Sequence, residues 1–368
     1  MSWLWEFIKK EYVVIIAGIA ALISCALVPV TDYMEYIDTD VLGVLFSLMI
    51  IITGMKGNNL LTRLSDEIIS RARIEGTRKA LVVVSLLTYF LSMFVTNDAA
   101  LIALVPLTVL FFAEYPDKLI YAVVVQTVAA NLGSMATPFG NPQNLLIFSA
   151  YKLTAWEFFR AAAPTALAGL GAVLILCLFM KDEAFVPAEY GEREITNKSF
   201  LVVYGILFIV TLLGVFGVVD ALVVFASACV VAVIMEPVRL REVDYGLLAT
   251  FVFFFIFVGN IRNIPAVNDF VTRLVEGREL FASAAISQVV SNVPAALMLT
   301  EFTDNWKAVM LGTDIGGLGT PVASLASLIS LRIYGETENA KTFKYLGVFL
   351  LINFAVLIPL YLFAAIQL

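Results

Sequence analysis

Two Gly- and Pro-rich stretches decide the fold of this chain: LGSMATPFGNPQNLL at Leu132–Leu146 and IGGLGTPVASLASLI at Ile315–Ile329. Each follows an apolar run and interrupts it, because Gly and Pro break helices and free backbone groups. The two stretches align without a gap. Repetition of so unusual a feature predicts a duplicated chain with one broken helix in each half. The matched positions are Gly133 with Gly316, Thr137 with Thr320, Pro138 with Pro321 and Leu145 with Leu328.

The composition places these breaks in a membrane. Of 368 residues, 61% are apolar and 14% are charged, against roughly 25% charged in a soluble domain. We therefore expect an all-α polytopic membrane protein with the lipid bilayer as its first partner. A net charge of −7 without a basic tract excludes nucleic acid as a partner. The sequence has no His, which excludes a His-ligated metal and a His-dependent nucleophile, so we expect no enzyme and no cofactor beyond a coupling ion.

Two pairs of apolar segments are joined by very short polar links. Thr96-Asn97-Asp98 joins the first pair, and Ser291–Pro294 joins the second. The second pair has segments of 11 and 8 residues, which reach only about 12–17 Å, roughly half of a ~30 Å hydrocarbon core. We therefore predict two re-entrant helical hairpins, at 80–113 and 280–303.

These paired features divide the chain into two repeats. The first repeat, 1–180, holds the hairpin at 80–113 and a broken helix at 119–150. A cytoplasmic linker and a connecting span follow at 181–217. The second repeat, 218–368, holds the hairpin at 280–303 and a broken helix at 306–331.

The basic residues predict how the two repeats are oriented, because Lys and Arg collect on the cytoplasmic side. A topology of nine full spans and two hairpins, with the N-terminus cytoplasmic and the C-terminus outside, leaves six of the 23 basic residues outside. The second repeat is then inverted relative to the first, in the cytoplasmic (inner) membrane. The six outside residues are Lys152, Arg160, Arg262, Arg273, Arg278 and Lys307.

Inverted repeats with discontinuous helices are typical of secondary transporters. Half-helix N-termini attract anions, and carbonyl-rich ends can hold Na⁺. The expected cargo is therefore a small ionic substrate bound where the hairpin tips and broken helices meet.

Several motifs make this expectation more specific. TNDAAL at Thr96–Leu101, with Pro106 after it, resembles the asparagine signature of ArsB/NhaD-type permeases, and Gly312–Ile329 resembles their second signature. Gly140–Ile147 and Ser291–Pro294 are most similar to the YbiR-type branch of anion permeases. The resemblance covers nearly the whole chain and identifies it as a member of the ion transporter superfamily with a citrate transporter-like domain.

The resemblance implies an elevator-type movement and, by analogy with dimeric relatives, a homodimer. It also implies that the hairpin tips and the loops after them bind substrate and coupling ion. The tips differ from the Ser-Asn-Thr tips of the dicarboxylate branch, so the substrate does not carry over. The implicated residues are Thr96, Asn97, Thr137, Asn141, Asn144, Ser291, Asn292, Thr320 and Ser324.

Two acids fall at these breaks, and an ionisable group at membrane depth is costly unless it is paired or functional. Asp98 aligns with Val293, and Asp314 aligns with Asn131. Our hypothesis is that one or both carry the coupled proton or bind Na⁺ together with the tip residues Asn97 and Asn292. The alternative is structural: Asp98 caps the half-helix that begins at Ala99, or hydrogen-bonds locally.

The sequence thus predicts a secondary active transporter that moves a small anion, an inorganic oxyanion or a carboxylate, with H⁺ or Na⁺ as the coupling ion. The alternative function is a Na⁺/H⁺ antiporter or an arsenite-type efflux permease. Two intramembrane acids favour the cation alternative, and the lack of Arg in the tip motifs weakens the case for a dianion. A passive channel and an intramembrane enzyme are disfavoured.

Overall fold

A computed structural model describes residues 12–28, 33–72, 74–184, 194–338 and 340–368. In these ranges the secondary structure is helical apart from one isolated bridge between Gly76 and Ala184, which confirms the expected all-α class. Among the described residues, six helices are long and apolar enough to cross a membrane: Thr39–Gly57, Thr77–Val95, Ala155–Phe179, Lys198–Val215, Tyr245–Arg262 and Thr342–Gln367.

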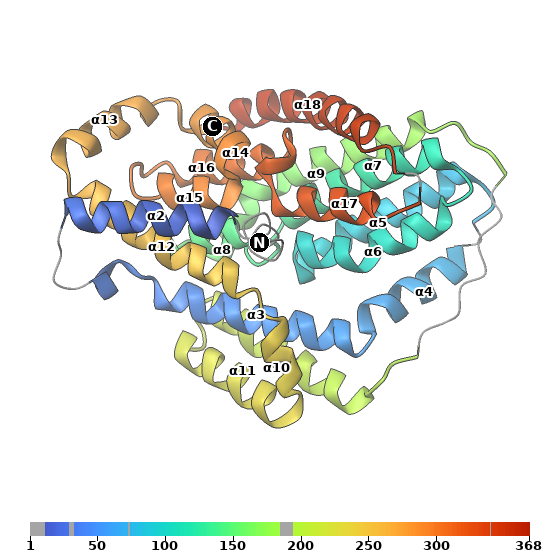
Figure 1. Ribbon diagram of the computed structural model, residues 1–368, viewed down its shortest axis with the longest axis horizontal. Coiled ribbons are helices and arrows are strands. Elements are labelled where there is room, and N and C mark those ends of the chain that lie inside the picture. Colours follow the sequence, from blue (N-terminus) through green and yellow to red (C-terminus); the bar gives the residue numbers. More distant parts are fainter. Residues whose placement is uncertain (1–11, 29–32, 73, 185–193, 339) are drawn as a thin grey trace, which may run out of the picture.

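One group of helices lies along the lower and left-hand parts of the molecule in the view of Figure 1. Within it α3 packs on α10 and α11, and α2 packs on α12. Amphipathic helices follow α3 and α12, as expected for segments that lie at a membrane surface. The bounds are α2 Tyr12–Leu27, α3 Thr39–Gly57, α4 Leu60–Ala72, α10 Lys198–Val215, α11 Ala221–Met235, α12 Tyr245–Arg262 and α13 Pro265–Val275.

The second group contains the two predicted hairpins. The first comprises α5 (Thr77–Val95) and α6 (Asn97–Phe111), and the second comprises α14 (Glu279–Val290) and α15 (Asn292–Leu299). Both ends of the first hairpin lie beside the segment that follows α9. The Thr77 amide donates to the Glu183 carbonyl, and the Tyr115 hydroxyl donates to the Ala184 carbonyl. Both hairpins differ from their predicted bounds by a few residues at their ends.

Both broken helices are interrupted at the positions that the sequence predicts. The first comprises α7 and α8, and the second comprises α16 and α17 with a short 3₁₀ turn, η3, between them. Helix α7 is deeply enclosed, with every residue from 122 to 134 buried. The bounds are α7 Pro116–Ser134, α8 Pro142–Ala150, α9 Ala155–Phe179, α16 Trp306–Gly316, η3 Pro321–Ala323, α17 Leu325–Gly335 and α18 Thr342–Gln367.

Each hairpin is tied to the broken helix of its own half by the same contact. The Thr137 hydroxyl donates to the Met93 carbonyl at 2.7 Å, and the Thr320 hydroxyl donates to the Gln288 carbonyl at 2.8 Å. These donors are aligned with each other, and both acceptors lie three residues before a hairpin tip. The two Thr residues that the sequence alignment pairs therefore make equivalent hydrogen bonds in the two halves. The domain boundaries and the inverted orientation of the halves stay predictions.

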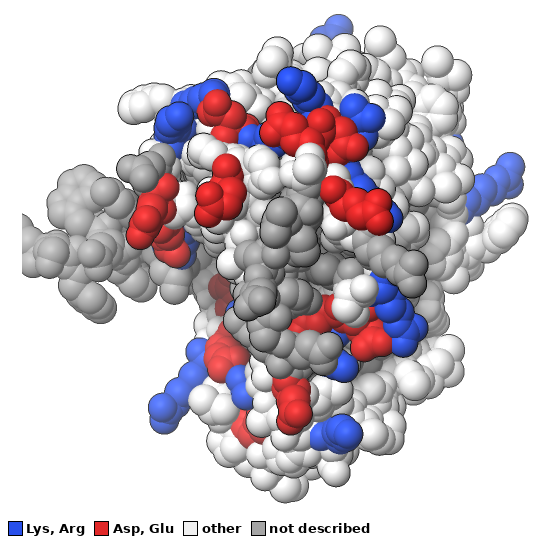
Figure 2. Space-filling view, turned by 90° about the vertical axis from the view of Figure 1, so that its right-hand side faces the viewer, with Lys and Arg blue, Asp and Glu red and all other residues white. Residues whose placement is uncertain are grey.

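Polar contacts gather at the two ends of the molecule. At one end Lys118 Nζ lies 2.9 Å from Glu183 Oε2, and Lys344 Nζ lies 2.7 Å from Asp117 Oδ1. Figure 2 looks onto this end and shows acidic and basic side chains gathered on it. At the other end Arg262 pairs with Glu301. The predicted topology, including which end is cytoplasmic, stays a prediction, and the N-terminal residues 1–11 lie outside the described residues.

Candidate functional site

A buried amide in α7 joins one hairpin tip to the opposite broken helix. Asn131 is 3% exposed, and its Oδ1 accepts from Asn97 Nδ2 at 3.1 Å and from Ser324 Oγ at 3.0 Å. Asn97 begins α6, directly after the first tip, and Ser324 precedes α17. Elements from both halves of the chain therefore meet on one side chain.

A buried acid in α16 has the corresponding position in the other half. Asp314 is 2% exposed, and its Oδ1 accepts from Asn141 Nδ2 at 3.0 Å and from Gln143 Nε2 at 3.3 Å. In the repeat alignment Asp314 corresponds to Asn131, and Asn141 corresponds to Ser324. The two broken helices thus exchange equivalent hydrogen bonds, each from the break of one to the helix of the other.

The polar cluster consists of Asn97, Asn131, Asn141, Gln143, Asn144, Asp314 and Ser324. Three of its polar atoms are buried without a hydrogen-bond partner among the described residues. They are Asn131 Nδ2, Asp314 Oδ2 and Asn144 Oδ1. Buried polar groups in proteins are nearly always satisfied, so each orphaned atom calls for an explanation. A donor and two acceptors left free at one crossing are what a polar ligand or a proton would engage.

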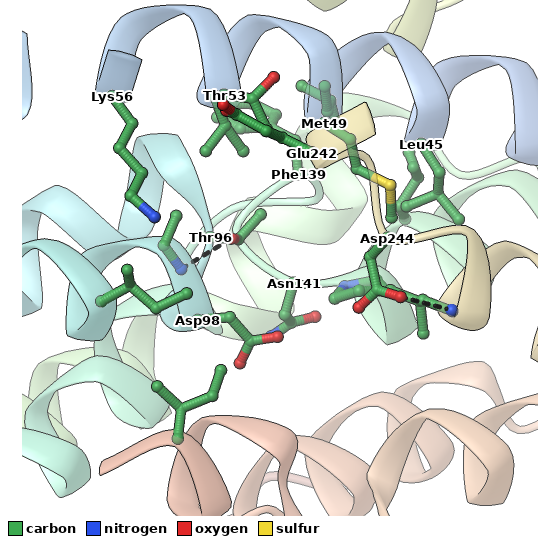
Figure 3. A pocket seen from close by; sticks show the side chains of 18 residues that line it. Leu45, Met49, Thr53, Lys56, Thr96, Asp98, Phe139, Asn141, Glu242 and Asp244 are labelled. Carbon is green, nitrogen blue, oxygen red and sulfur yellow. Dashed lines mark hydrogen bonds between the residues drawn. The ribbon is translucent and has the colours of Figure 1, made fainter. Parts of the chain in front are cut away.

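A cavity of about 270 Å³ reaches the cluster at Asn141. In Figure 3, Lys56 reaches down from α3 at the left, Thr96, Asp98 and Asn141 lie below that helix, and Asp244 lies at the right. Most of the other lining residues are apolar, and Glu242, at the end of η2 (Pro237–Glu242), completes the charged set. Glu242 is ion-paired with Arg239 at 2.8 Å, which leaves the carboxyl groups of Asp98 and Asp244 with the ammonium group of Lys56 in the lining.

The alternative in which Asp98 caps the second helix of the first hairpin is wrong. Helix α6 begins at Asn97, and its N-cap is Thr96, whose Oγ1 accepts from the Ala99 amide at 3.4 Å. The Asp98 amide donates to Asn97 Oδ1 at 3.0 Å, while Asp98 Oδ1 has no partner among the described residues. The Asp98 carboxyl is therefore not the cap of α6.

The remaining predicted residues divide between the cluster and its supports. Thr137 and Thr320 bind hairpin carbonyls, and Asn144 Nδ2 donates to the Met135 and Thr137 carbonyls at 3.4 Å each. At the second tip Ser291 Oγ donates to the Ala323 carbonyl at 3.4 Å. Asn292 is buried and lies near Gly317, but no hydrogen bond between described residues joins it to Asn131 or Asp314.

Sequence reasoning missed four residues of the site: Asn131, Gln143, Glu242 and Asp244. The alignment of Asn131 with Asp314 was the one signal for the first of them. Glu242 and Asp244 belong to a polar connection that the sequence does not place near a hairpin tip. No group of three or more Cys, Asp or Glu residues in the described ranges could hold a metal ion, and the predicted Na⁺ near Asn97, Asp98, Asn292 and Asp314 stays a prediction.

Two helical hairpins and two broken helices around a buried polar cluster, with a cavity leading to it, define this chain as a multi-pass membrane transporter. Residues 1–305 match the CitMHS family, described as citrate transporter. The chain belongs to this family, which confirms the predicted superfamily.

Relatives agree with that assignment, and the named ones are transporters or membrane proteins and not enzymes. An uncharacterized transporter of Methanocaldococcus jannaschii is 31% identical over 306 residues, covering 82% of this chain and 83% of its own. The inner membrane protein YbiR of Escherichia coli is 29% identical over 306 residues, covering 82% and 81%. A silicon efflux transporter of Oryza sativa subsp. japonica is 29% identical over 167 residues, covering 45% and 34%.

The fold is also similar to that of a solved structure. The YdaH transporter of Alcanivorax borkumensis superposes with a TM-score of 0.59 at 14% sequence identity, and the match covers 96% of each chain. At this identity the likeness establishes the fold alone.

Proposed function

We propose that this protein is a secondary active transporter that moves a small anion, an inorganic oxyanion or a carboxylate, across the cytoplasmic membrane with H⁺ or Na⁺ as the coupling ion. The observation that carries the proposal is the exchange of equivalent hydrogen bonds, Ser324 to Asn131 and Asn141 to Asp314, between the two broken helices. A site built from both repeats can be opened to either side in turn. An elevator-type movement of the hairpin and broken-helix group past the α3–α10–α11 layer would accomplish this.

The chemistry of the cluster supports an oxygen-rich solute. The free Asn131 Nδ2 is a donor, and α8 directs its N-terminal amides toward the break that Asn141 caps. Helix N-termini and amide donors bind oxyanions and carboxylates. The carboxyl groups of Asp98 and Asp244 in the cavity lining oppose multiply charged anions, so the proposed cargo carries at most one negative charge.

A second candidate function rests on that same acidic cavity. Asp98 and Asp244 attract a cation and do not repel a neutral hydroxide. The corresponding activities are Na⁺/H⁺ antiport and an efflux of the arsenite or silicic acid kind, the latter in line with the silicon efflux transporter among the relatives.

A ligand panel separates these candidates. Purified protein would be heated with formate or nitrate as monoanions, citrate as a trianion, silicic acid as a neutral hydroxide, and Na⁺ or Li⁺ as cations. We expect a monoanion to raise the melting temperature. Stabilisation by silicic acid alone or by Na⁺ alone would move the assignment to the second candidate.

The crossed hydrogen bonds are tested by Asn131→Ala. This substitution leaves Asn97 Nδ2 and Ser324 Oγ without an acceptor, at a cost of about 1–3 kcal/mol for each buried group left unpaired. We expect at least a tenfold loss of uptake of the stabilising ligand into proteoliposomes. The matched control is Asn353→Ala in α18, since Asn353 is equally buried but donates only to the Phe349 carbonyl of its own helix. Equal uptake by the two variants contradicts the proposal.

The orientation and assembly belong to the same proposal. The N-terminus is cytoplasmic, the C-terminus is outside, and the functional unit is a homodimer, by analogy with elevator-type transporters. Thiol labelling of single Cys residues at the two ends, from each side of sealed vesicles, tests the orientation. The mass of the detergent-solubilised protein tests the dimer.

A further inference from the structure

One basic side chain lines the cavity that reaches the polar cluster, and its charge is unpaired. Among the described residues of that lining, Lys56 is the one Lys or Arg. Its ammonium group makes no hydrogen bond or ion pair with any described residue. Figure 3 shows the side chain reaching down from α3 toward the level of Thr96. Because Lys56 is exposed, this ammonium group is available to a solute that enters the cavity.

Two carboxylates near the end of α3 are held by an arginine of η2. Arg239 Nη2 lies 2.9 Å from Glu236 Oε1, and Arg239 Nη1 lies 2.8 Å from Glu242 Oε1. The other oxygen of Glu236 accepts from Asn58 Nδ2 at 2.8 Å and from the Tyr204 hydroxyl at 3.0 Å. The charges of both carboxylates are therefore compensated within this network, and neither needs a further cation.

A Gly brings this arginine next to Lys56. A Cβ built on Gly57 would lie 2.1 Å from Arg239 Cζ and 2.2 Å from Arg239 Nη1, so the guanidinium group lies against the backbone of the last turn of α3. Gly57 directly follows Lys56 in the sequence. Arg239 Nη1 contacts both carboxylate oxygens of Glu242, at 2.8 and 3.0 Å. Glu242 and Lys56 line the same cavity, but the carboxylate is paired with the arginine and not with the lysine.

A single unpaired ammonium group in this cavity favours a monoanion. Apolar walls of low dielectric constant focus the field of a charge in a cleft and raise the local concentration of ions of opposite sign. The carboxyl groups of Asp98 and Asp244 lie in the same lining and oppose further negative charge. Lys56 can therefore offset one negative charge on a solute, but not two or three.

We propose that Lys56 determines the charge selectivity of this transporter by attracting the anionic cargo into the cavity, and that Arg239 keeps Lys56 available by holding Glu242. Lys56 is the group that meets the cargo, whereas Arg239 is a positioning residue that acts through Glu242. This inference rests on the proposed function, because it requires an anionic cargo. It extends the site to a residue of α3 that lies outside the hairpin tips and the broken helices.

Substitutions of Lys56 test the first part of the proposal. Uptake of nitrate and formate into proteoliposomes is measured over a range of concentrations. We expect Lys56→Gln to raise the KM about tenfold and to leave the maximal rate nearly unchanged, since the lost interaction acts on binding. Lys56→Arg keeps the charge and should keep the KM. The matched control is Lys198→Gln, because Lys198 is exposed and lines neither of the two cavities.

A pair of variants tests the role of Arg239. Arg239→Gln releases Glu242, which can then pair with Lys56, so the KM should rise as it does in Lys56→Gln. The double variant Arg239→Gln/Glu242→Gln should restore the KM, because no released carboxylate competes for Lys56. A purely structural role predicts no recovery, since Glu236 loses its arginine in both variants.

Amine labelling read by mass spectrometry provides a measurement on the wild type that needs no variant. A water-soluble acylating reagent should modify Lys56, and nitrate should protect it. Labelling of Lys56 that nitrate does not slow overturns the proposal. So does a KM that is the same in Lys56→Gln and the wild type, and failure of the double variant to recover removes the role of Arg239. A wild type that transports neither monoanion contradicts the proposed function itself, which distinguishes the two failures.

Discussion

At the scale of the residue, the hairpin tips store conformational strain. Thr96 has φ 75° and ψ 152°, and Ser291 has φ 78° and ψ 156°. This backbone region is essentially restricted to Gly, and each such residue costs on the order of 1–3 kcal/mol. The residue after each tip is an Asn that begins the second helix of the hairpin. The strained turn therefore fixes where Asn97 and Asn292 are held.

We predict that relieving this strain raises stability and lowers transport. A Gly at position 291 can adopt the tip conformation without strain, and the Ser291 side chain caps no helix. The Ser291→Gly substitution should therefore raise the free energy of unfolding by about 1 kcal/mol. Uptake should fall because Asn292 is held less firmly. The matched control is Ser291→Ala, which removes the hydroxyl and keeps the strain. A Gly variant no more stable than the Ala variant would show that the tip is not strained.

The sequence predicts much of this site because its residues interrupt apolar runs. Asn97, Asn141 and Ser324 stand at breaks, where a polar side chain is conspicuous. Asn131 lies inside a continuous helix, and its role depends on a contact with Ser324, 193 positions away. Such a contact is decided by how the helices cross. A single sequence contains no local signal for it beyond the internal alignment.

At the scale of the element, each hairpin crosses its broken helix at a Gly. A Cβ built on Gly133 would lie 2.1 Å from the Tyr89 carbonyl oxygen, and one on Gly316 would lie 2.9 Å from Ala284 Cα. Small residues let helix backbones approach closely in membranes. These two aligned positions therefore set how closely α5 lies against α7 and α14 against α16. The pairing of the two Gly residues was predictable from the sequence, but the helix that each one contacts was not.

Gly133→Ala should destabilise the protein by about 1–3 kcal/mol, since the crossing must open to admit a methyl group beside backbone. Thermal unfolding in detergent measures this. Gly171→Ala in α9 is the control, because nothing lies within 4 Å of its Cβ position, and Ala there should be neutral or stabilising by up to about 1 kcal/mol. If both substitutions shift the melting temperature alike, close approach at Gly133 does not limit packing.

At the scale of the whole molecule, two cavities border α8. The first, of about 270 Å³, reaches Asp98 and Asn141, and the second, of about 590 Å³, is lined by Lys152 and Asp220 and by none of the cluster residues. Leu145 lines both cavities. Of these two cavities, only the first is lined by residues of the site. The order of the elements follows from the sequence, but the place of each cavity depends on how the two helix groups pack.

If transport requires the hairpin and broken-helix group to slide past the α3–α10–α11 layer, tying α8 to α10 should stop it. The Phe148 and Phe216 rings join these helices with centroids 5.9 Å apart, while Phe148 and Phe158 join α8 to α9 at 6.0 Å. We expect a short thiol cross-linker to abolish uptake in a Phe148→Cys/Phe216→Cys variant and to spare it in Phe148→Cys/Phe158→Cys. Both variants would be made with Cys25, Cys177 and Cys229 replaced by Ala. Because Phe148 is common to both pairs and the spacings match, the two variants differ chiefly in whether the link crosses between the groups. Full uptake after complete cross-linking of the first pair would mean that α8 and α10 move together, and the elevator-type movement would have to be abandoned.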